Sequence, residues 1–286
     1  MIEEILTKSG LKHLEWFESL LRDARIPDPN SICDIAARTI RLYSDRNQDS
    51  PRSLMPLEVR WYRSLRESGV ADYSVYADHQ YLGELWACWS IYSRNYLVEA
   101  RKMRSLAPTG VLDAVRGHGA VVDLGNGIGM STAALRQLFP ESIVYGTNLR
   151  ETSQWTVSKV MQDRFGFHMV ENLNEIKSPV GLVFASEYFE HFDEPIVHLE
   201  QVVESLSPNS FLIASAFGAD AIGHFDLYQH NGTCLGKKGV GRMFNKRLVE
   251  LGYMKVATSL WNNRPSLWIK RENRLDLKSL LYEKSI

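Results

Sequence analysis

The chain has 286 residues, of which 44% are hydrophobic and 23% charged, and its formal net charge at pH 7 is −1. This composition is typical of a soluble globular protein with one large domain, or one domain with a substantial attachment. The absence of a global positive charge argues against broad nucleic-acid binding, so a nucleic-acid partner is expected only if a local basic patch exists.

The cysteines and the N-terminus indicate a cytoplasmic protein. Cys33, Cys88 and Cys234 are scattered, odd in number and without zinc-finger spacing, which is typical of incidental thiols in a reducing compartment. The first residues are acidic and lack a long apolar core, so they do not form a secretory signal. No apolar run approaches the roughly 20 residues that cross a bilayer, and no membrane partner is expected.

Residues 1–110 are predicted to form a helical N-terminal domain that acts as a lid, as a substrate-binding element or in homo-oligomerisation. Apolar residues recur at helical spacing between 11 and 21 and between 32 and 40, and the longest predicted helix runs from about 74 to 106. Its stripe of Trp86, Trp89, Tyr92 and Tyr96 forms either a core contact or a cover over a site.

Residues 111–272 show a different pattern, in which strands and helices alternate. Strands are predicted at 120–124, 142–147, 167–170, 180–185 and 211–216, with a closing hairpin at 253–258 and 266–270, and a tail follows at 273–286. Alternation of this kind favours an α/β fold with a doubly wound, mostly parallel, seven-stranded sheet.

Three glycines at alternate positions, Gly125, Gly127 and Gly129, lie between the predicted strand 120–124 and a predicted helix at 131–138. Glycine permits unusual backbone angles and lets a ligand approach the main chain. The helix that follows presents N–H groups without backbone partners, which attract an anionic or polar group. The sequence therefore predicts a site for a nucleotide-type cofactor.

The spacing of these glycines differs from the dinucleotide fingerprint G-x-G-x-x-G, because the third glycine comes one residue early and Met130 holds the later position. Asp123 in front of Gly125-x-Gly127-x-Gly129 resembles motif I of the class I S-adenosylmethionine-dependent methyltransferases. The resemblance covers roughly residues 117–271, and such a fold would end in a hairpin with its last strand antiparallel. It implies S-adenosylmethionine as cofactor, bound by Asp123, Gly125, Asn126, Gly127, Gly129 and Ser186.

Two further cofactor contacts are implied by the resemblance. The family usually has an acidic residue after the second strand to bind the ribose hydroxyls, and this chain has Asn148 there, which lacks the charge. After the third strand, Asn172 and Leu173 occupy the place where the family contacts adenine. A polar turn with one core leucine is the alternative for that pair.

A second motif, Glu187-x-x-Glu190-His191, follows the fourth strand. If these residues form one helical turn, their side chains share a face, where two carboxylates need a cation or a shared proton. The motif is similar to that of the metal-binding small-RNA 3′-terminal 2′-O-methyltransferases and the ubiquinone-pathway O-methyltransferases. The resemblance implies a further histidine ligand, either His224 or His230, and a site for Mg²⁺, Mn²⁺ or Fe²⁺.

The alternative to this metal site is a metal-free site in which His191 or His224 acts as general base. The leading hypothesis is methyl transfer from S-adenosylmethionine to an oxygen or nitrogen of a small molecule, with or without a metal. A methyltransferase of the 3′-terminal ribose of RNA and a catalytically inactive binding module are the alternatives.

Overall fold

The computed structural model describes residues 10–44, 56–97, 119–256 and 265–273. Its N-terminal part is helical, as the sequence predicts. The elements are the 3₁₀-helix η1 (Gly10–His13), α2 (Leu14–Asp23), α3 (Pro29–Ser44), α4 (Pro56–Ser68), the 3₁₀-helix η2 (Tyr73–Ala77), α5 (Tyr81–Cys88) and the π-helix η3 (Trp89–Ser93).

The single long helix predicted from residue 74 is wrong at its start. The segment begins as the short helix η2, whose first turn is capped by the carboxylate of Asp72, which accepts a hydrogen bond from the backbone N–H of Ser74. Asp78 then adopts an extended conformation, with ψ 129°, so α5 begins only at Tyr81. The end predicted at residue 106 lies outside the described residues.

The main sheet has seven strands in the order β3-β2-β1-β4-β5-β9-β8. In chain order the strands are β1 (Ala120–Leu124), β2 (Val144–Thr147), β3 (His168–Val170), β4 (Val180–Ser186), β5 (Ser210–Ala214), β8 (Tyr253–Val256) and β9 (Ser266–Lys270). The first five are parallel to one another, and β9 is antiparallel to both β5 and β8. The predicted doubly wound, Rossmann-like methyltransferase fold with its closing hairpin is confirmed.

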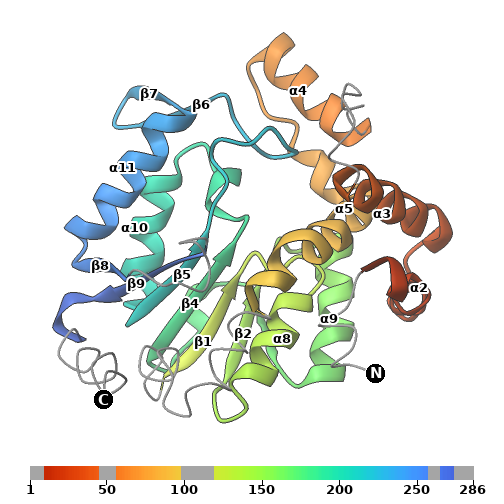
Figure 1. The fold of residues 1–286 in the computed structure, drawn as a ribbon, viewed down its shortest axis with the longest axis horizontal. Helices are drawn as coiled ribbons and strands as arrows, with labels where there is room; N and C mark the ends of the chain where they lie inside the picture. Colours follow the sequence, from red (N-terminus) through yellow and green to blue (C-terminus); the bar gives the residue numbers. More distant parts are fainter. Residues whose placement is uncertain (1–9, 45–55, 98–118, 257–264, 274–286) are drawn as a thin grey trace.

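Helices cover both faces of this sheet (Figure 1). They are α8 (Met130–Leu138), α9 (Ser153–Phe165), α10 (Pro195–Leu206) and α11 (Lys237–Glu250), with short 3₁₀-helices η4 (Leu173–Glu175), η5 (Phe189–His191) and η6 (Arg271–Asn273). Helices α10 and α11 lie on one side and α8 and α9 on the other, where α2 also packs against α9. A small hairpin, β6 (Leu227–His230) and β7 (Thr233–Gly236), was not predicted.

The core follows from the alternation of side chains along the strands. Val121 belongs to the hydrophobic cluster with α8 and α9, and Val122 to the cluster on the opposite face with α10 and α11. Phe17 and Trp86 are buried in the same cluster as Val121, so the N-terminal helices share a core with the sheet. The predicted boundary at residue 110 and, except for Asn273 at the end of η6 (Arg271–Asn273), the predicted tail at 273–286 fall outside the described residues.

The strand order reverses between β1 and β4, the two central neighbours of the sheet. Open α/β sheets bind ligands in the crevice beyond the carboxyl ends of the strands at such a point. Helix α5 lies near those ends (Figure 1). None of the described helices is both long and apolar enough to traverse a bilayer.

Candidate active site

The glycine turn begins at the carboxyl end of β1, which is buried along its whole length. Gly125 and Gly127 have φ angles of 64° and 56°, in the left-handed region that favours glycine. A Cβ at Gly125 would overlap the ring of Tyr188, so that position also lacks space for a side chain. Helix α8 begins at Met130 without a side-chain hydrogen bond to its N-cap, which leaves backbone N–H donors at its first turn.

Asp123 fastens this first turn to the end of β1. One of its carboxylate oxygens accepts hydrogen bonds from the hydroxyls of Ser131 (2.6 Å) and Thr132 (2.7 Å). Burial raises the pKa of Asp123 to about 7, although the two hydroxyl donors oppose that increase. Asp123 is 1% exposed, so it orders the glycine turn and the first turn of α8 from the protein interior.

Asn148 also holds the glycine turn, and its amide is required for this contact. Its Nδ2 donates to the backbone carbonyl of Gly127 (2.5 Å) and to Oδ1 of Asn126 (3.0 Å). A carboxylate has no proton to donate and would face both oxygens. An amide at this position is therefore explained by its hydrogen bonds to the glycine turn. Asn148 is not among the described residues that line the cavity.

The two residues predicted to contact adenine, Asn172 and Leu173, lie outside the described lining of the cavity. Asn172 and Leu173 form the start of η4, where Asn172 and Glu175 cap each other reciprocally. This arrangement matches the alternative of a polar turn, and an adenine contact at these residues stays a prediction.

A cavity of about 490 Å³ lies beyond the carboxyl ends of β1 and β4. Its walls come from the glycine turn, the end of β4, the loop after β5, and a roof formed by α5 and η3. The described lining includes Asp123, Gly125, Asn126, Gly127, Met130, Ser131, Ser186, Glu187, His191, Ala219, Asp220 and His224, and from the roof Tyr81, Glu84, Leu85, Cys88, Trp89, Ile91, Tyr92 and Ser93.

The roof is joined to the sheet at this cavity. The hydroxyl oxygens of Ser93 and Ser186 are 2.8 Å apart and share a hydrogen bond. Trp86 stacks on Phe17, with ring centroids 4.5 Å apart, inside the core, whereas Trp89 and Tyr92 line the cavity. Of the predicted aromatic stripe, Trp86 is therefore a core residue, whereas Trp89 and Tyr92 face the cavity.

The Glu187-x-x-Glu190-His191 motif does not form one helical turn. Glu187 has a φ of 51°, and its backbone N–H bonds to the carbonyl of Ala214 (2.7 Å), so only Phe189–His191 is helical. Glu190 is fully buried, and its Oε1 accepts from the backbone N–H of Ala216 (2.6 Å). Its side chain therefore holds the loop after β5.

No group of three or more His, Cys, Asp or Glu side chains that could hold a metal is found among the described residues. The predicted site for Mg²⁺, Mn²⁺ or Fe²⁺, with Glu187, Glu190, His191 and His224 as ligands, is therefore not supported. The cause is the left-handed residue Glu187, which breaks the helical spacing on which the prediction depended.

The structure does bring His191 and His224 together. Their ring centroids are 5.1 Å apart with the planes at 89°, and both residues line the cavity. Nδ1 of His191 is 2.9 Å from the hydroxyl of Tyr76, and Nδ1 of His224 is 3.0 Å from the carbonyl of Ala219. Burial and, to a smaller extent, the neighbouring His224 lower the pKa of His191 to about 3. The alternative residue, His230, lies on β6 outside the described lining.

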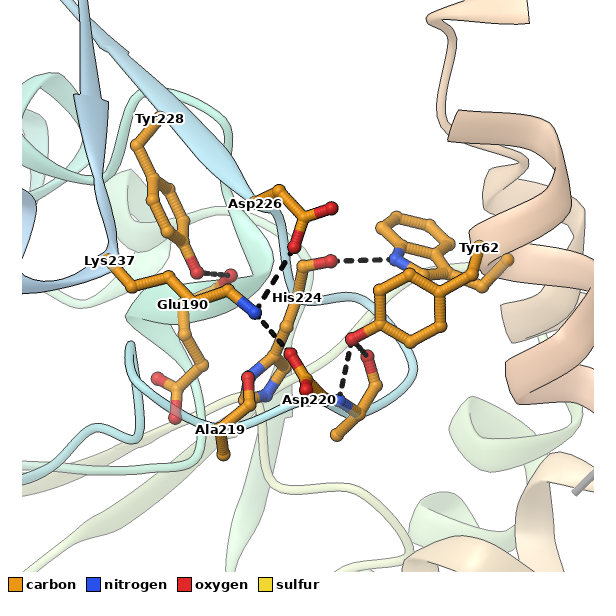
Figure 2. A network of polar contacts seen from close by, with 10 residues as sticks. Tyr62, Glu190, Ala219, Asp220, His224, Asp226, Tyr228 and Lys237 are labelled. Carbon is orange, nitrogen blue, oxygen red and sulfur yellow. Dashed lines mark hydrogen bonds and ion pairs between the residues drawn. The ribbon is translucent and has the colours of Figure 1, made fainter. Parts of the chain in front are cut away.

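The loop that carries His224, residues 215–226, is fastened by a polar network (Figure 2). The hydroxyl of Tyr62 accepts from the backbone N–H of Ala221 (2.9 Å), and the indole N–H of Trp61 donates to the carbonyl of His224 (2.8 Å). Lys237 forms ion pairs with Asp220 and Asp226, and the hydroxyl of Tyr228 donates to the carbonyl of Glu190.

Three aromatic residues that position this site, Trp61, Tyr62 and Tyr76, were missed in the sequence. They come from α4 and η2 and contact residues more than 100 positions away in the chain. No spacing rule connects residues so far apart. Their aromatic character was the only signal, and it does not distinguish a core residue from one that orders a site.

No protein-family model matches the sequence, and no curated protein matches it. The chain is similar in structure to a candidate O-methyltransferase from Nostoc punctiforme, at 13% identity and a TM-score of 0.49, over 75% of this chain and 69% of that one. The mitomycin 7-O-methyltransferase MmcR gives 13% identity and a TM-score of 0.47, over 87% of this chain and 74% of its own.

A protein of an O-methyltransferase family from Burkholderia thailandensis gives 12% identity and a TM-score of 0.45, over 84% of this chain and 70% of that one. At identities this low, the reaction of a similar structure says nothing about the reaction of this chain. The chemistry of the cavity has to decide it.

Proposed function

We propose that this protein is an S-adenosylmethionine-dependent methyltransferase that acts on an oxygen or nitrogen atom of a small molecule. The observation that carries the proposal is the composition of one cavity. Its wall contains the glycine turn at Gly125 and Gly127 and, facing the same space, the side chains of His191 and His224. The glycine turn and two imidazoles that can accept a proton therefore line one cavity.

The residues of the cavity fit S-adenosylmethionine. The volume of about 490 Å³ is within the range of small-molecule and cofactor sites. The first turn of α8, at Met130 and Ser131, lines the cavity and offers backbone N–H groups to a carboxylate. The backbone of Gly125 and Gly127 forms an adjoining wall without side chains, which permits a close approach.

The protein's share of the reaction is to hold the acceptor, exclude water and receive a proton. S-adenosylmethionine supplies an activated methyl group when bound, so the reaction needs alignment more than further activation. His191 or His224 is placed to take the proton that the acceptor loses. The roof of α5 and η3 lines the same cavity, and Leu85 of α5 lies directly beside Gly127.

The described lining favours a small molecule over the end of an RNA. It contains the aromatic rings of Tyr81, Trp89 and Tyr92, and in the part of the chain that the structure describes it includes neither lysine nor arginine. Proteins recognise a phosphate backbone largely through lysine and arginine side chains. The alternative of an inactive binding module depended on Asn148 as a departure from the family pattern. That argument is weakened, because the Asn148 amide is needed to hold the glycine turn.

Calorimetry with S-adenosylhomocysteine tests the donor site, and transfer of labelled methyl groups to metabolite extracts and to RNA tests the reaction. We expect the wild type to bind S-adenosylhomocysteine and to label a small molecule. His224→Gln should retain binding and lose transfer by about 100-fold or more, the usual size of a general-base contribution. Failure of the wild type to bind either form of the cofactor would reject the proposal.

A further inference from the structure

The proton positions on His191 follow from its contact with Tyr76. Tyr76 is 7% exposed. Its hydroxyl makes one hydrogen bond among the described residues, and that bond is to Nδ1 of His191. A buried hydroxyl proton needs an acceptor, so Nδ1 must carry the lone pair. The neutral ring then bears its proton on Nε2. Burial keeps His191 neutral, since it lowers the pKa to about 3.

His224 is held in the opposite tautomer. Its Nδ1 is 3.0 Å from the carbonyl oxygen of Ala219, and a carbonyl oxygen can only accept. Nδ1 of His224 therefore carries the proton, and in the neutral ring Nε2 carries the lone pair. The two imidazoles, with centroids 5.1 Å apart, thus offer one donor and one acceptor at the same cavity.

The backbone around Tyr76 is adapted to this contact. Gly223 has a φ of 82°, and a Cβ there would overlap both the hydroxyl of Tyr76 and the ring of His191. Any other residue at 223 would separate the pair. Tyr76 itself is fixed by edge contacts with Tyr81 (5.1 Å) and a tilted contact with Trp61 (6.2 Å), measured between ring centroids.

We infer that the two histidines recognise a hydroxyl group of the acceptor, which donates to Nε2 of His224 and accepts from the Nε2–H of His191. The inference rests on the proposed function and narrows its oxygen-or-nitrogen acceptor to oxygen. Tyr76 is a positioning residue, because it acts on the acceptor only through His191.

A hydroxyl fits this pair better than an amine does. It has one proton and two lone pairs, so it can donate to one histidine and accept from the other at once. An ammonium group has no lone pair for the Nε2–H of His191, which would then lose its partner in a buried site. A neutral amine would have to give up to His191 the same lone pair with which it attacks.

The roles in the transfer follow from these positions. The acceptor oxygen forms a bond to the methyl carbon as the carbon–sulfur bond of S-adenosylmethionine breaks, the electron pair stays on sulfur, and the hydroxyl proton passes to Nε2 of His224. His191 keeps its proton and orients the oxygen. His224 is the general base, and His191 is a hydrogen-bond donor.

Nitrogen NMR of protein labelled with ¹⁵N-histidine tests the tautomers without any reaction. Two-bond proton–nitrogen spectra show which ring nitrogen is protonated, and the spectra of His191→Gln and His224→Gln assign the two rings. We expect the Nε2–H form for His191 and the Nδ1–H form for His224. The same tautomer on both rings, or the reverse pair, would overturn the inference.

Tyr76→Phe, with Tyr73→Phe as the matched control, tests the positioning role. Both tyrosines lie on η2, but only the hydroxyl of Tyr76 bonds to His191. We expect Tyr76→Phe to give His191 a mixture of tautomers and to lower kcat about tenfold or more, with little change in the KM of S-adenosylmethionine. Tyr73→Phe should leave both unchanged. A pure Nε2–H form in Tyr76→Phe would refute the role of Tyr76.

The acceptor atom is identified from the product. After incubation with S-adenosylmethionine that carries a ¹³C-methyl group, the carbon shift of the labelled product separates an O-methyl from an N-methyl group. An O-methyl product supports the hydroxyl assignment, and an N-methyl product rejects it while leaving methyl transfer intact. Loss of S-adenosylhomocysteine binding in the wild type would instead reject the proposed function itself.

Discussion

Asn148 and Asp123 show how single polar groups order the glycine turn. Asn148 donates to the carbonyl of Gly127, and Asp123 accepts from the first turn of α8. Asp123 was recognisable in the sequence because it stands in a motif. The partners of Asn148 were not, because they depend on the φ angle of Gly127 and on how β2 lies beside β1.

Asn148→Asp is expected to weaken the fold at neutral pH. The carboxylate would face the oxygens of Gly127 and Asn126 without a proton to share, so the free energy of unfolding should fall by about 1–3 kcal/mol. Urea denaturation measures this change. The exposed substitution Asn174→Asp is the control and should have almost no effect; an equal loss in both variants would contradict the role of Asn148.

Asp123 makes the stability depend on pH. Its pKa is raised from 3.8 to about 7 in the folded protein, so between those values the folded state retains a proton that the unfolded chain has lost. The free energy of unfolding should therefore fall as the pH rises through this window and level off above it. Asp123→Asn should reduce the slope.

Urea denaturation at about pH 5 and about pH 8 gives the comparison for Asp123. Asp163→Asn, an exposed change on α9, is the control and should keep the slope of the wild type. An unchanged slope in Asp123→Asn would show that this carboxyl group is ionised in the folded protein throughout.

At the scale of elements, the decisive contact is the one between α4 and the loop 215–226. Strand and helix positions could be predicted from apolar patterns, because each depends on neighbouring residues. The contact of Tyr62 with Ala221 could not be predicted in this way, because it joins residues 159 positions apart in the chain. The helical turn predicted at Glu187 was wrong for a related reason. The left-handed backbone of Glu187 depends on the hydrogen bond from its N–H to the carbonyl of Ala214, at the end of β5.

Tyr62→Phe is expected to loosen the loop that carries His224. The change leaves the N–H of Ala221 without its acceptor, at a cost of about 1–3 kcal/mol if the group stays buried. Hydrogen exchange of residues 216–224 should become faster, while the rate in β1 stays unchanged. Tyr73→Phe, which removes a hydroxyl from the same region, should leave the loop as it is in the wild type.

At the scale of the whole molecule, the N-terminal helices and the sheet build one site. The seven-stranded sheet and the glycine turn were predictable, because the pattern of each strand is local. The roof was predicted only as one of two alternatives, because the aromatic stripe gives no sign of which residues face the core and which face the cavity. Trp86 and Trp89 are three residues apart, and only Trp89 lines the cavity.

Binding of S-adenosylhomocysteine should protect both halves of the cavity. We expect slower hydrogen exchange in residues 81–93 of the roof and in residues 125–131 of the glycine turn, because a bound ligand stabilises the state that holds it. Strand β8, at the edge of the sheet, serves as the internal reference. Protection of the glycine turn alone would mean that the roof does not close on the ligand.

The hydrogen bond between Ser93 and Ser186 joins the roof to the end of β4. Gly125 and Gly127 line the cavity from the sheet, and Trp89, Ile91 and Tyr92 line it from the roof. A change of acceptor can thus be sought by exchanging roof residues while the glycine turn is left untouched. Under the proposed function, a library of roof variants should change the preferred acceptor and leave binding of S-adenosylhomocysteine intact.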